Sequence, residues 1–223
     1  MSSGLAPLAA TRTLATHTRQ AVLAAIADGR MAPGERYSVA QLAEQLGISR
    51  TPVREALLVL EREGRVRFER NRGVRVLETT AADVAEVFEL RLLLEVPAAV
   101  KACGIVDTDA LQVELDAMGE RSRAGDEPGF MDRDERFHEL ILLAAGNRRL
   151  AAIVAGLRDT VRGRGASTVG RSRSLDEILA EHGAILDALR SGDADRAGAA
   201  MRYHLRRTGD LLATQYGAAA PTP

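Results

Sequence analysis

The chain has 223 residues, of which 46% are hydrophobic, 27% are charged and only 3% are aromatic. This composition is typical of a soluble globular protein, and a core of Leu, Ala and Val favours helices over a β-sandwich. The single cysteine, Cys103, excludes an internal disulfide framework and a cysteine-rich zinc site, and it fits a reducing cytoplasm. Residues 1–10 lack a signal-peptide pattern and no apolar run approaches the ~20 residues of a membrane span, so we expect a cytoplasmic protein.

Positive and negative charges are separated along the chain, although the net charge is only −1. Residues 1–77 carry 12 Lys and Arg against 7 Asp and Glu, whereas the remainder carries 18 against 24. A basic first third followed by an acidic remainder indicates a polyanionic partner for the first third only. Chance segregation of surface charge is the alternative interpretation.

Three helices are predicted within residues 13–63. The first starts near Thr13, after residues 1–12 that we expect to be disordered, and it ends before Pro33 and Gly34. Its apolar face consists of Leu14, Val22, Leu23 and Ile26.

The second and third helices form a helix–turn–helix. The second spans residues 39–45, buries Leu42 and Leu46, and ends at Gly47, as helices commonly end at a glycine. The third spans residues 50–63 and has helical periodicity. Its inward face consists of Val53, Ala56, Leu57 and Leu60.

An alternating pattern follows the helix–turn–helix. Val66-Arg67-Phe68 and Val74-Arg75-Val76 alternate apolar and basic side chains on either side of residues 69–73, which predicts a two-stranded β-hairpin. A helix–turn–helix followed by a hairpin is the winged form of the DNA-binding module. We therefore assign residues 13–77 to a winged helix-turn-helix DNA-binding domain.

Every element predicted after residue 77 is a helix. These helices span residues 81–103, 107–124, 128–145, 148–163, 174–190 and 193–216. Asp107 and Asp193 are expected to cap two of them, and Gly217–Pro223 to form a disordered tail. The predicted fold class is mainly α, with an N-terminal winged helix-turn-helix followed by an all-α antiparallel helical bundle over residues 81–216.

The third helix begins with side chains suited to DNA. Arg50 and Arg54 are four residues apart and share one face, and Thr51 between them can reach a phosphate or a thymine methyl group. Arg72 lies with Arg70 at the expected hairpin tip, where a wing meets the flanking DNA backbone or the minor groove. A solvated arginine face on an ordinary helix is the alternative interpretation.

Residues 32–60, which include Gln-Leu-Gly-Ile-Ser-Arg-Thr-Pro-Val-Arg-Glu-Ala-Leu, resemble the winged-helix domain of GntR-family transcriptional regulators. The resemblance implies a cytoplasmic bacterial repressor or activator that binds a short palindrome of double-stranded DNA as a homodimer. It also implies that Arg50, Thr51, Arg54 and the wing glycine Gly73 lie at the DNA.

Three of the four histidines and one aspartate occupy positions where helical periodicity asks for apolar residues. His182 and His204 belong to the apolar stripes of two predicted helices. Asp134 and His138 are four residues apart on a third helix. A buried imidazole or carboxylate without a partner costs several kcal/mol, and one shared metal ion would remove this cost for all four. Independent core histidines, each with a backbone partner, are the alternative.

This nitrogen-rich set with one carboxylate suits a divalent transition metal, with zinc and nickel favoured over iron and manganese, and it disfavours Ca²⁺ and Mg²⁺. The segments Asp134–His138, Glu181-His182 and His204-Leu205 also resemble the metal-binding signature of the FCD-type effector domain in the FadR subgroup of GntR regulators. The resemblance implies that Asp134, His138, His182 and His204 are the ligands. It also implies that a small organic or sugar acid, or water, completes the coordination.

Arg91 and Glu181 are the remaining residues of interest near this set. Arg91 is expected to pair with the carboxylate of the effector, because a guanidinium forms two parallel hydrogen bonds with that group. The alternative for Arg91 is a structural ion pair with Glu95, which lies four residues further along the same helix. Glu181 is expected to be solvated, and the alternative is that it supports a neighbouring metal ligand from outside the ligand set.

The sequence therefore predicts a ligand-responsive DNA-binding transcriptional regulator that is not an enzyme. Its helical domain binds a metal ion and a small carboxylate effector, and the effector modulates operator binding. A metal-dependent hydrolase or oxygenase on a helical bundle is the alternative, with Glu135 or Glu181 as a base. A regulator in which the metal is structural or absent is a third interpretation.

Overall fold

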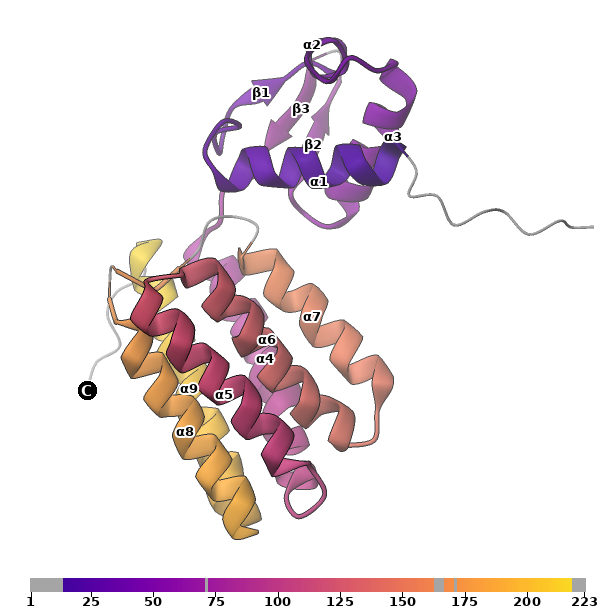
Figure 1. The fold of residues 1–223 in the computed structure, drawn as a ribbon. Coiled ribbons are helices and arrows are strands. Elements are labelled where there is room, and N and C mark those ends of the chain that lie inside the picture. Colours follow the sequence, from indigo (N-terminus) through magenta and orange to yellow (C-terminus); the bar gives the residue numbers. More distant parts are fainter. Residues whose placement is uncertain (1–13, 71, 163–166, 171, 218–223) are drawn as a thin grey trace, which may run out of the picture. The chain divides into compact units, whose positions relative to one another are not determined.

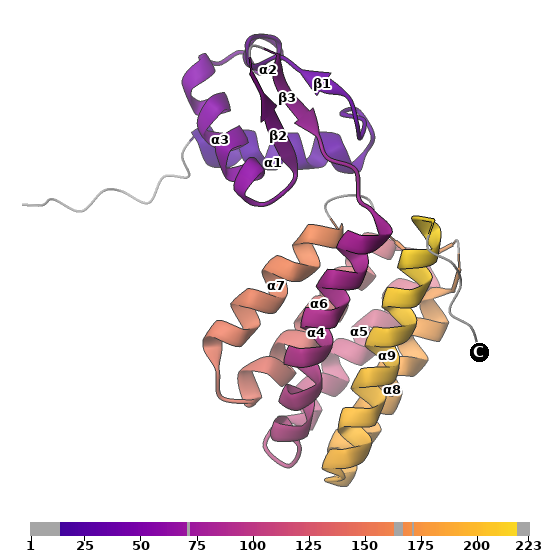
Figure 2. The same ribbon diagram turned by 180° about the vertical axis from the view of Figure 1, so that it is seen from behind.

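The structure is a computed structural model that describes residues 14–70, 72–162, 167–170 and 172–217. The disorder predicted for residues 1–12 and for the tail beyond Gly217 falls outside these ranges. The chain divides into two compact units with a boundary between Glu78 and Thr79. Figures 1 and 2 show both units from opposite sides.

The N-terminal unit contains helices and a small antiparallel sheet. Its elements are α1 (Leu14–Ala27), β1 (Arg36–Tyr37), α2 (Val39–Leu46), α3 (Arg50–Arg62), β2 (Val66–Glu69) and β3 (Gly73–Val76). The strand order is β1-β3-β2. The sequence predicted only the β2–β3 hairpin, and the third strand is added by β1, where Arg36 pairs with Arg75 and Tyr37 pairs with Val74.

The buried side of this unit differs from the prediction at two residues. Leu14 is 58% exposed and Leu46 is 38% exposed, so the prediction that they face the core was wrong. Each is the terminal residue of its helix, where the helix leaves the core. In α2, Ala43 is buried next to Leu42 instead. Gly47 ends α2, as predicted, and the structure shows it in the left-handed conformation.

The C-terminal unit is an all-helical bundle. Its helices are α4 (Ala81–Ala102), α5 (Thr108–Ala124), α6 (Glu127–Ala144), α7 (Arg148–Arg162), α8 (Leu175–Ser191) and α9 (Ala194–Gln215). Asp107 and Asp193 accept hydrogen bonds from first-turn amides, which confirms both predicted N-caps. The predicted fold class is confirmed, and no described helix is long and apolar enough to cross a membrane.

Close packing of α4 against α9 orients the inner faces of the bundle. A Cβ atom on Gly209 would lie 2.8 Å from the ring of Phe88, and a Cβ atom on Gly198 would lie 2.8 Å from Val100. The two backbones can approach this closely because both positions are glycine. Large side chains such as Phe137 are fully buried in the unit, and burial of each stabilises the fold by roughly 1.5–3 kcal/mol.

Candidate metal centre and nucleic-acid interface

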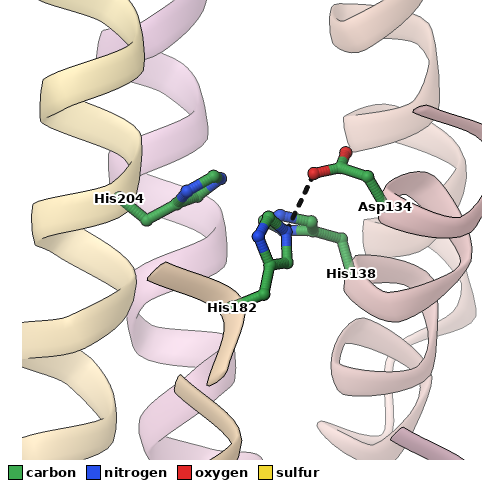
Figure 3. Close-up of side chains that lie close together, drawn as sticks. All are labelled: Asp134, His138, His182 and His204. Carbon is green, nitrogen blue, oxygen red and sulfur yellow. Dashed lines mark ion pairs between the residues drawn. The ribbon is translucent and has the colours of Figure 1, made fainter. Parts of the chain in front are cut away.

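Four titratable side chains converge inside the helical unit. Asp134 and His138 come from α6, where a spacing of four residues places them on one face. His182 comes from α8 and His204 from α9. All four are at most 3% exposed, and each offers a ligand atom within 4.8 Å of those of the others. Figure 3 shows the three imidazoles and the carboxylate close together, so the structure brings the whole predicted ligand set to one place.

Hydrogen bonds from outside the cluster orient two of the imidazoles. His138 Nδ1 donates to Glu95 Oε2 over 2.6 Å. His182 Nδ1 donates to the carbonyl oxygen of Ile178 over 2.8 Å. Because both partners are acceptors, Nδ1 carries the proton and Nε2 keeps its lone pair in the neutral ring. Both Nε2 atoms are buried without a hydrogen-bond partner among the described residues, which fits metal ligation through Nε2.

A buried carboxylate orients the third imidazole. His204 Nδ1 donates to Glu181 Oε2 over 2.8 Å. Glu181 also accepts from Arg173 Nη1 at 2.7 Å and from Arg207 Nη1 at 2.9 Å, and it is only 6% exposed. The prediction that Glu181 is solvated was therefore wrong. Its partners come from the segment before α8 and from α9, and the sequence alone does not place these segments beside it.

Asp134 lies between a cation and a ligand nitrogen. One of its oxygens accepts from Arg158 of α7. The other, Oδ1, lies 2.8 Å from Nε2 of His182 without the alignment of a hydrogen bond. Two electron-rich atoms at this separation repel each other, and a metal ion about 2 Å from each would replace repulsion by attraction. The residues present therefore fit a divalent transition metal, and the cluster can bind one.

The imidazoles of His182 and His204 are neutral at pH 7. Burial, followed by the effect of neighbouring His138, lowers the pKa of His182 from 6.5 to about 3. Burial also lowers the pKa of His204 well below 6.5. Metals bind the neutral imidazole, so neither residue has to lose a proton before it ligates a metal ion at neutral pH.

Protein stripped of metal by a chelator should lose stability in mild acid. Unfolded histidines bind protons below about pH 6.5, whereas folded His182 does so only near pH 3 and His204 is shifted in the same direction. The unfolded state therefore binds more protons as the pH falls below 6.5. The free energy of unfolding should drop by roughly 1 kcal/mol per pH unit for each of the two histidines. Urea titrations at pH 7, 6 and 5 measure this slope.

His182→Asn provides the comparison for this slope. The variant lacks one of the two imidazoles, so its stability should depend about half as steeply on pH between 6.5 and 5. Glu95 does not interfere in this window. Burial raises its pKa, but neighbouring Arg91 and His138 outweigh burial and hold the pKa far below its usual 4.5. Equal slopes in the two proteins would contradict the assignment of neutral buried histidines.

Arg91 is tied to the cluster through Glu95. Arg91 Nε donates to Glu95 Oε1 over 2.6 Å, and the other oxygen of Glu95 accepts from His138. The Arg91 side chain is buried, and its Cζ lies 5.0 Å from the ring centroid of Phe88. Arg91 Nη2 is buried without a hydrogen-bond partner among the described residues. The structural ion pair with Glu95 therefore exists, and it leaves part of the guanidinium unpaired.

A cavity of about 310 Å³ lies between α6 and α7 beside the cluster. Its lining includes His138 and Arg158, together with Glu135 and Arg148. The volume is at the lower end of the ~300–1,000 Å³ of small-molecule sites. The structure thus brings one residue of the cluster and two guanidinium groups to a space of ligand size. Arg91 does not belong to the described lining.

On the N-terminal unit, the predicted DNA-binding residues surround a surface hollow of about 720 Å³. Arg50, Thr51 and Arg54 of α3 line the hollow together with Gly73 of β3. Arg72 is exposed next to the start of β3, but it is not part of the described lining. Four of the five residues therefore share one concave surface, on which positive charge and a hydroxyl group are accessible.

Glycine is required at position 73 by the sheet itself. Gly73 has φ +85°, and a Cβ atom there would lie 2.2 Å from the carbonyl oxygen of Tyr37. It pairs with Glu69 across the hairpin. A side chain at position 73 would therefore push β1 away from β3, whatever its effect on DNA.

Phe68 of β2 is a residue of the hollow that sequence analysis missed. The Arg54 guanidinium lies over its ring, with Cζ 5.6 Å from the centroid, and Phe68 lines the hollow. Such a cation–π contact is worth about 0.5–1 kcal/mol at an exposed site and favours one orientation of Arg54. The alternation Val66-Arg67-Phe68 places Phe68 on the face of Val66, but only the fold shows that this face meets α3.

The two units match two family models. Residues 14–76 match "Bacterial regulatory proteins, gntR family", and residues 86–207 match "FCD domain". The second match alone covers more than half of the chain. The chain therefore belongs to the GntR family of bacterial regulatory proteins and carries a C-terminal FCD domain, which confirms the resemblance noted in both parts of the sequence.

Individual relatives agree with this family membership. The chain is 28% identical to the HTH-type transcriptional regulator YdhC of Bacillus subtilis, over 77% of this chain and 79% of YdhC. It is 30% identical to the HTH-type transcriptional regulator LutR of the same organism, over 84% of this chain and 95% of LutR. It shares the fold of E. coli McbR/YncC with a TM-score of 0.73 at 23% identity, over 92% and 99% of the two chains. The protein is a DNA-binding transcriptional regulator with an effector domain, and its sequence relatives are regulators and not enzymes.

Proposed function

We propose that this regulator detects a small carboxylate through a divalent transition metal in its helical domain and answers by changing its affinity for a palindromic operator. The observation that carries the proposal is the buried set Asp134, His138, His182 and His204, whose ligand atoms lie within 4.8 Å of one another beside a cavity. Zinc or nickel is the proposed metal, with iron and manganese as the other candidates. Residues 13–77 are the proposed DNA-binding domain and residues 81–216 the proposed effector domain.

The proposed effector is an organic or sugar acid. When bound, the metal supplies an electrophilic position that can accept a carboxylate oxygen. Arg91 is the proposed second contact, because its Nη2 is buried without a partner and a guanidinium pairs well with a carboxylate. Glu95 accepts hydrogen bonds of 2.6 Å from both Arg91 and His138. One side chain therefore fixes the positions of a proposed metal ligand and of the proposed carboxylate contact. The cavity of about 310 Å³ suits a molecule of this size, and its described lining includes His138 but not Arg91.

The proposed DNA contacts come from α3 and from the wing. Arg50, Thr51 and Arg54 are at the N-terminal end of α3, the part of a recognition helix that meets base edges. Arg72 and Gly73 are the proposed wing contacts. A winged helix of this kind reads one half-site, so a palindromic operator requires two copies of the chain, and we propose a homodimer.

Effector binding is proposed to act by shifting populations. An effector changes operator affinity only if it binds one arrangement of the dimer better than the other. A typical coupling of about 1–3 kcal/mol corresponds to a change of roughly 5–150-fold in operator affinity.

A DNA duplex selected by the protein from a random pool permits a direct test. The logarithm of the protein's affinity for this duplex should fall linearly with the logarithm of the salt concentration. The slope should be about −0.9 for each phosphate contact. The affinity should exceed that for a scrambled duplex by about 10³-fold or more. A panel of carboxylic acids that includes citrate and D-gluconate, added to zinc-loaded protein, should contain members that shift operator affinity roughly 5–150-fold.

The same panel on chelator-stripped protein is the control. The shift in operator affinity should vanish with the metal and return when zinc is added back. A shift of equal size without metal would overturn the proposed role of the metal. Affinity that is indifferent to both salt and DNA sequence would overturn the proposed operator binding.

A further inference from the structure

One apolar stripe of α4 is uncovered in the helical unit. Leu90, Leu93, Pro97 and Val100 are all exposed, Leu93 to 64% and Leu90 to 47%. Their spacing of three or four residues places them on a single face of the helix. In Figure 2, α4 lies in front of the described part of this unit, between α7 and α9. A contiguous exposed apolar stripe of this kind is typical of a surface that binds another protein.

The charges at the two ends of the stripe have opposite signs. Glu86 lies toward its N-terminal end and Lys101, the only lysine in the sequence, lies at its C-terminal end, and both are exposed. The midpoint between Glu86 and Lys101 falls at Leu93-Leu94, and the midpoint between Leu90 and Pro97 falls at the same place. The stripe is therefore complementary in charge and in apolar side chains to a second, antiparallel copy of itself.

From this symmetry we infer that a second copy of the chain covers the stripe, with the two α4 helices antiparallel and crossing at Leu93. Glu86 of each copy then lies beside Lys101 of the other, and Leu90 packs twice against Pro97. A parallel pairing would instead set Glu86 against Glu86 and Lys101 against Lys101, where like charges repel. The contact is the isologous kind that a twofold dimer uses. The inference rests on the proposed homodimer and supplies its interface.

The single lysine makes the pairing testable by zero-length cross-linking of the full chain. A carbodiimide activates a carboxylate, and the lysine amine displaces the activating group to form an amide, while the carbodiimide leaves as a urea. Glu86 and Lys101 of one helix are roughly 22 Å apart along its axis, too far to be joined within a chain. We expect a covalent dimer in which mass spectrometry identifies the Glu86–Lys101 amide.

Substitutions distinguish the interface from folding. Leu93→Asp places two like charges at the crossing and should weaken self-association at least 10-fold in sedimentation equilibrium. Val113→Asp is the matched control, because Val113 of α5 is also 64% exposed, and it should leave self-association unchanged. Glu86→Lys and Lys101→Glu should each weaken the dimer, and the double variant should restore it.

The experiments distinguish failure of the proposed interface from failure of the proposed homodimer. A dimer that persists in Leu93→Asp, or a cross-linked dimer without the Glu86–Lys101 amide, would overturn this interface and leave the proposed operator and metal binding in place. A wild-type chain that stays monomeric at concentrations that saturate the selected duplex would overturn the homodimer as well.

Discussion

His182→Ala should abolish stoichiometric metal binding and make the stability of the protein insensitive to chelators. Its buried Nε2 is the proposed ligand atom and has no hydrogen-bond partner among the described residues, although Oδ1 of Asp134, another proposed ligand, lies 2.8 Å away. Loss of a residue that only orients a ligand typically costs about 10–100-fold in metal affinity, so loss of the ligand itself should cost more than about 100-fold. At a zinc concentration 1,000 times Kd, the wild-type protein should gain about 4 kcal/mol of stability that the variant lacks. Elemental mass spectrometry and thermal unfolding with and without chelator measure both effects.

His17→Ala is the matched control for this experiment. His17 is the remaining histidine of the sequence and is exposed on α1, in the other unit. This variant should keep its full metal content and its response to chelator. His182 is completely buried, so its truncation also leaves a cavity and lowers stability without metal. The chelator-dependent difference is therefore the readout, and full metal content in His182→Ala would exclude His182 from the site.

Arg54→Ala should reduce operator affinity by about 1–3 kcal/mol, which is roughly 5–150-fold, and should relax base preference at one position of each half-site. Arg54 lines the hollow and lies over Phe68, and no carboxylate of the described residues forms an ion pair with it. Its guanidinium can therefore meet a guanine edge without first breaking an internal ion pair. Fluorescence anisotropy with the selected duplex at several salt concentrations measures the loss.

Arg62→Ala is the matched control on the same helix. Arg62 is an exposed arginine at the opposite end of α3, about 12 Å further along its axis, where its Nε donates to the carbonyl of Leu58. Its removal should change operator affinity by less than about twofold. A loss in Arg54→Ala that is equal for selected and scrambled duplexes would assign Arg54 to a phosphate instead of a base. Unchanged affinity would contradict the placement of α3 at the DNA.

The helices and the ligand cluster were predictable because both leave periodic marks in the sequence. Apolar residues every three or four positions locate a helix and its inward face, and Asp107 and Asp193 mark where two helices begin. The same periodicity places His182 and His204 inside, since both stand where an apolar residue is expected. The local pattern is sufficient to predict a helix and its inward face when each helix buries its own apolar stripe in one common core.

Features made by contacts between distant segments were not predictable in this way. The two residues of β1 are too few to show an alternating pattern, and they form a strand only because β3 lies beside them. Arg158 is 24 residues from Asp134, and Glu95 is 43 residues from His138, yet both are in contact across the bundle. No spacing rule connects such pairs, because their separation along the chain depends on loop and helix lengths.

Glu95 connects the candidate metal cluster to the helix that follows the winged unit. It accepts the His138 hydrogen bond in the second half of α4, and α4 begins at Ala81, shortly after the last strand of the winged unit ends at Val76. Glu95 lies about 21 Å along the helix axis from the first residue of α4. The candidate metal cluster is thus tied by a hydrogen bond to the same helix that follows residues 77–80, the segment at which the winged unit ends.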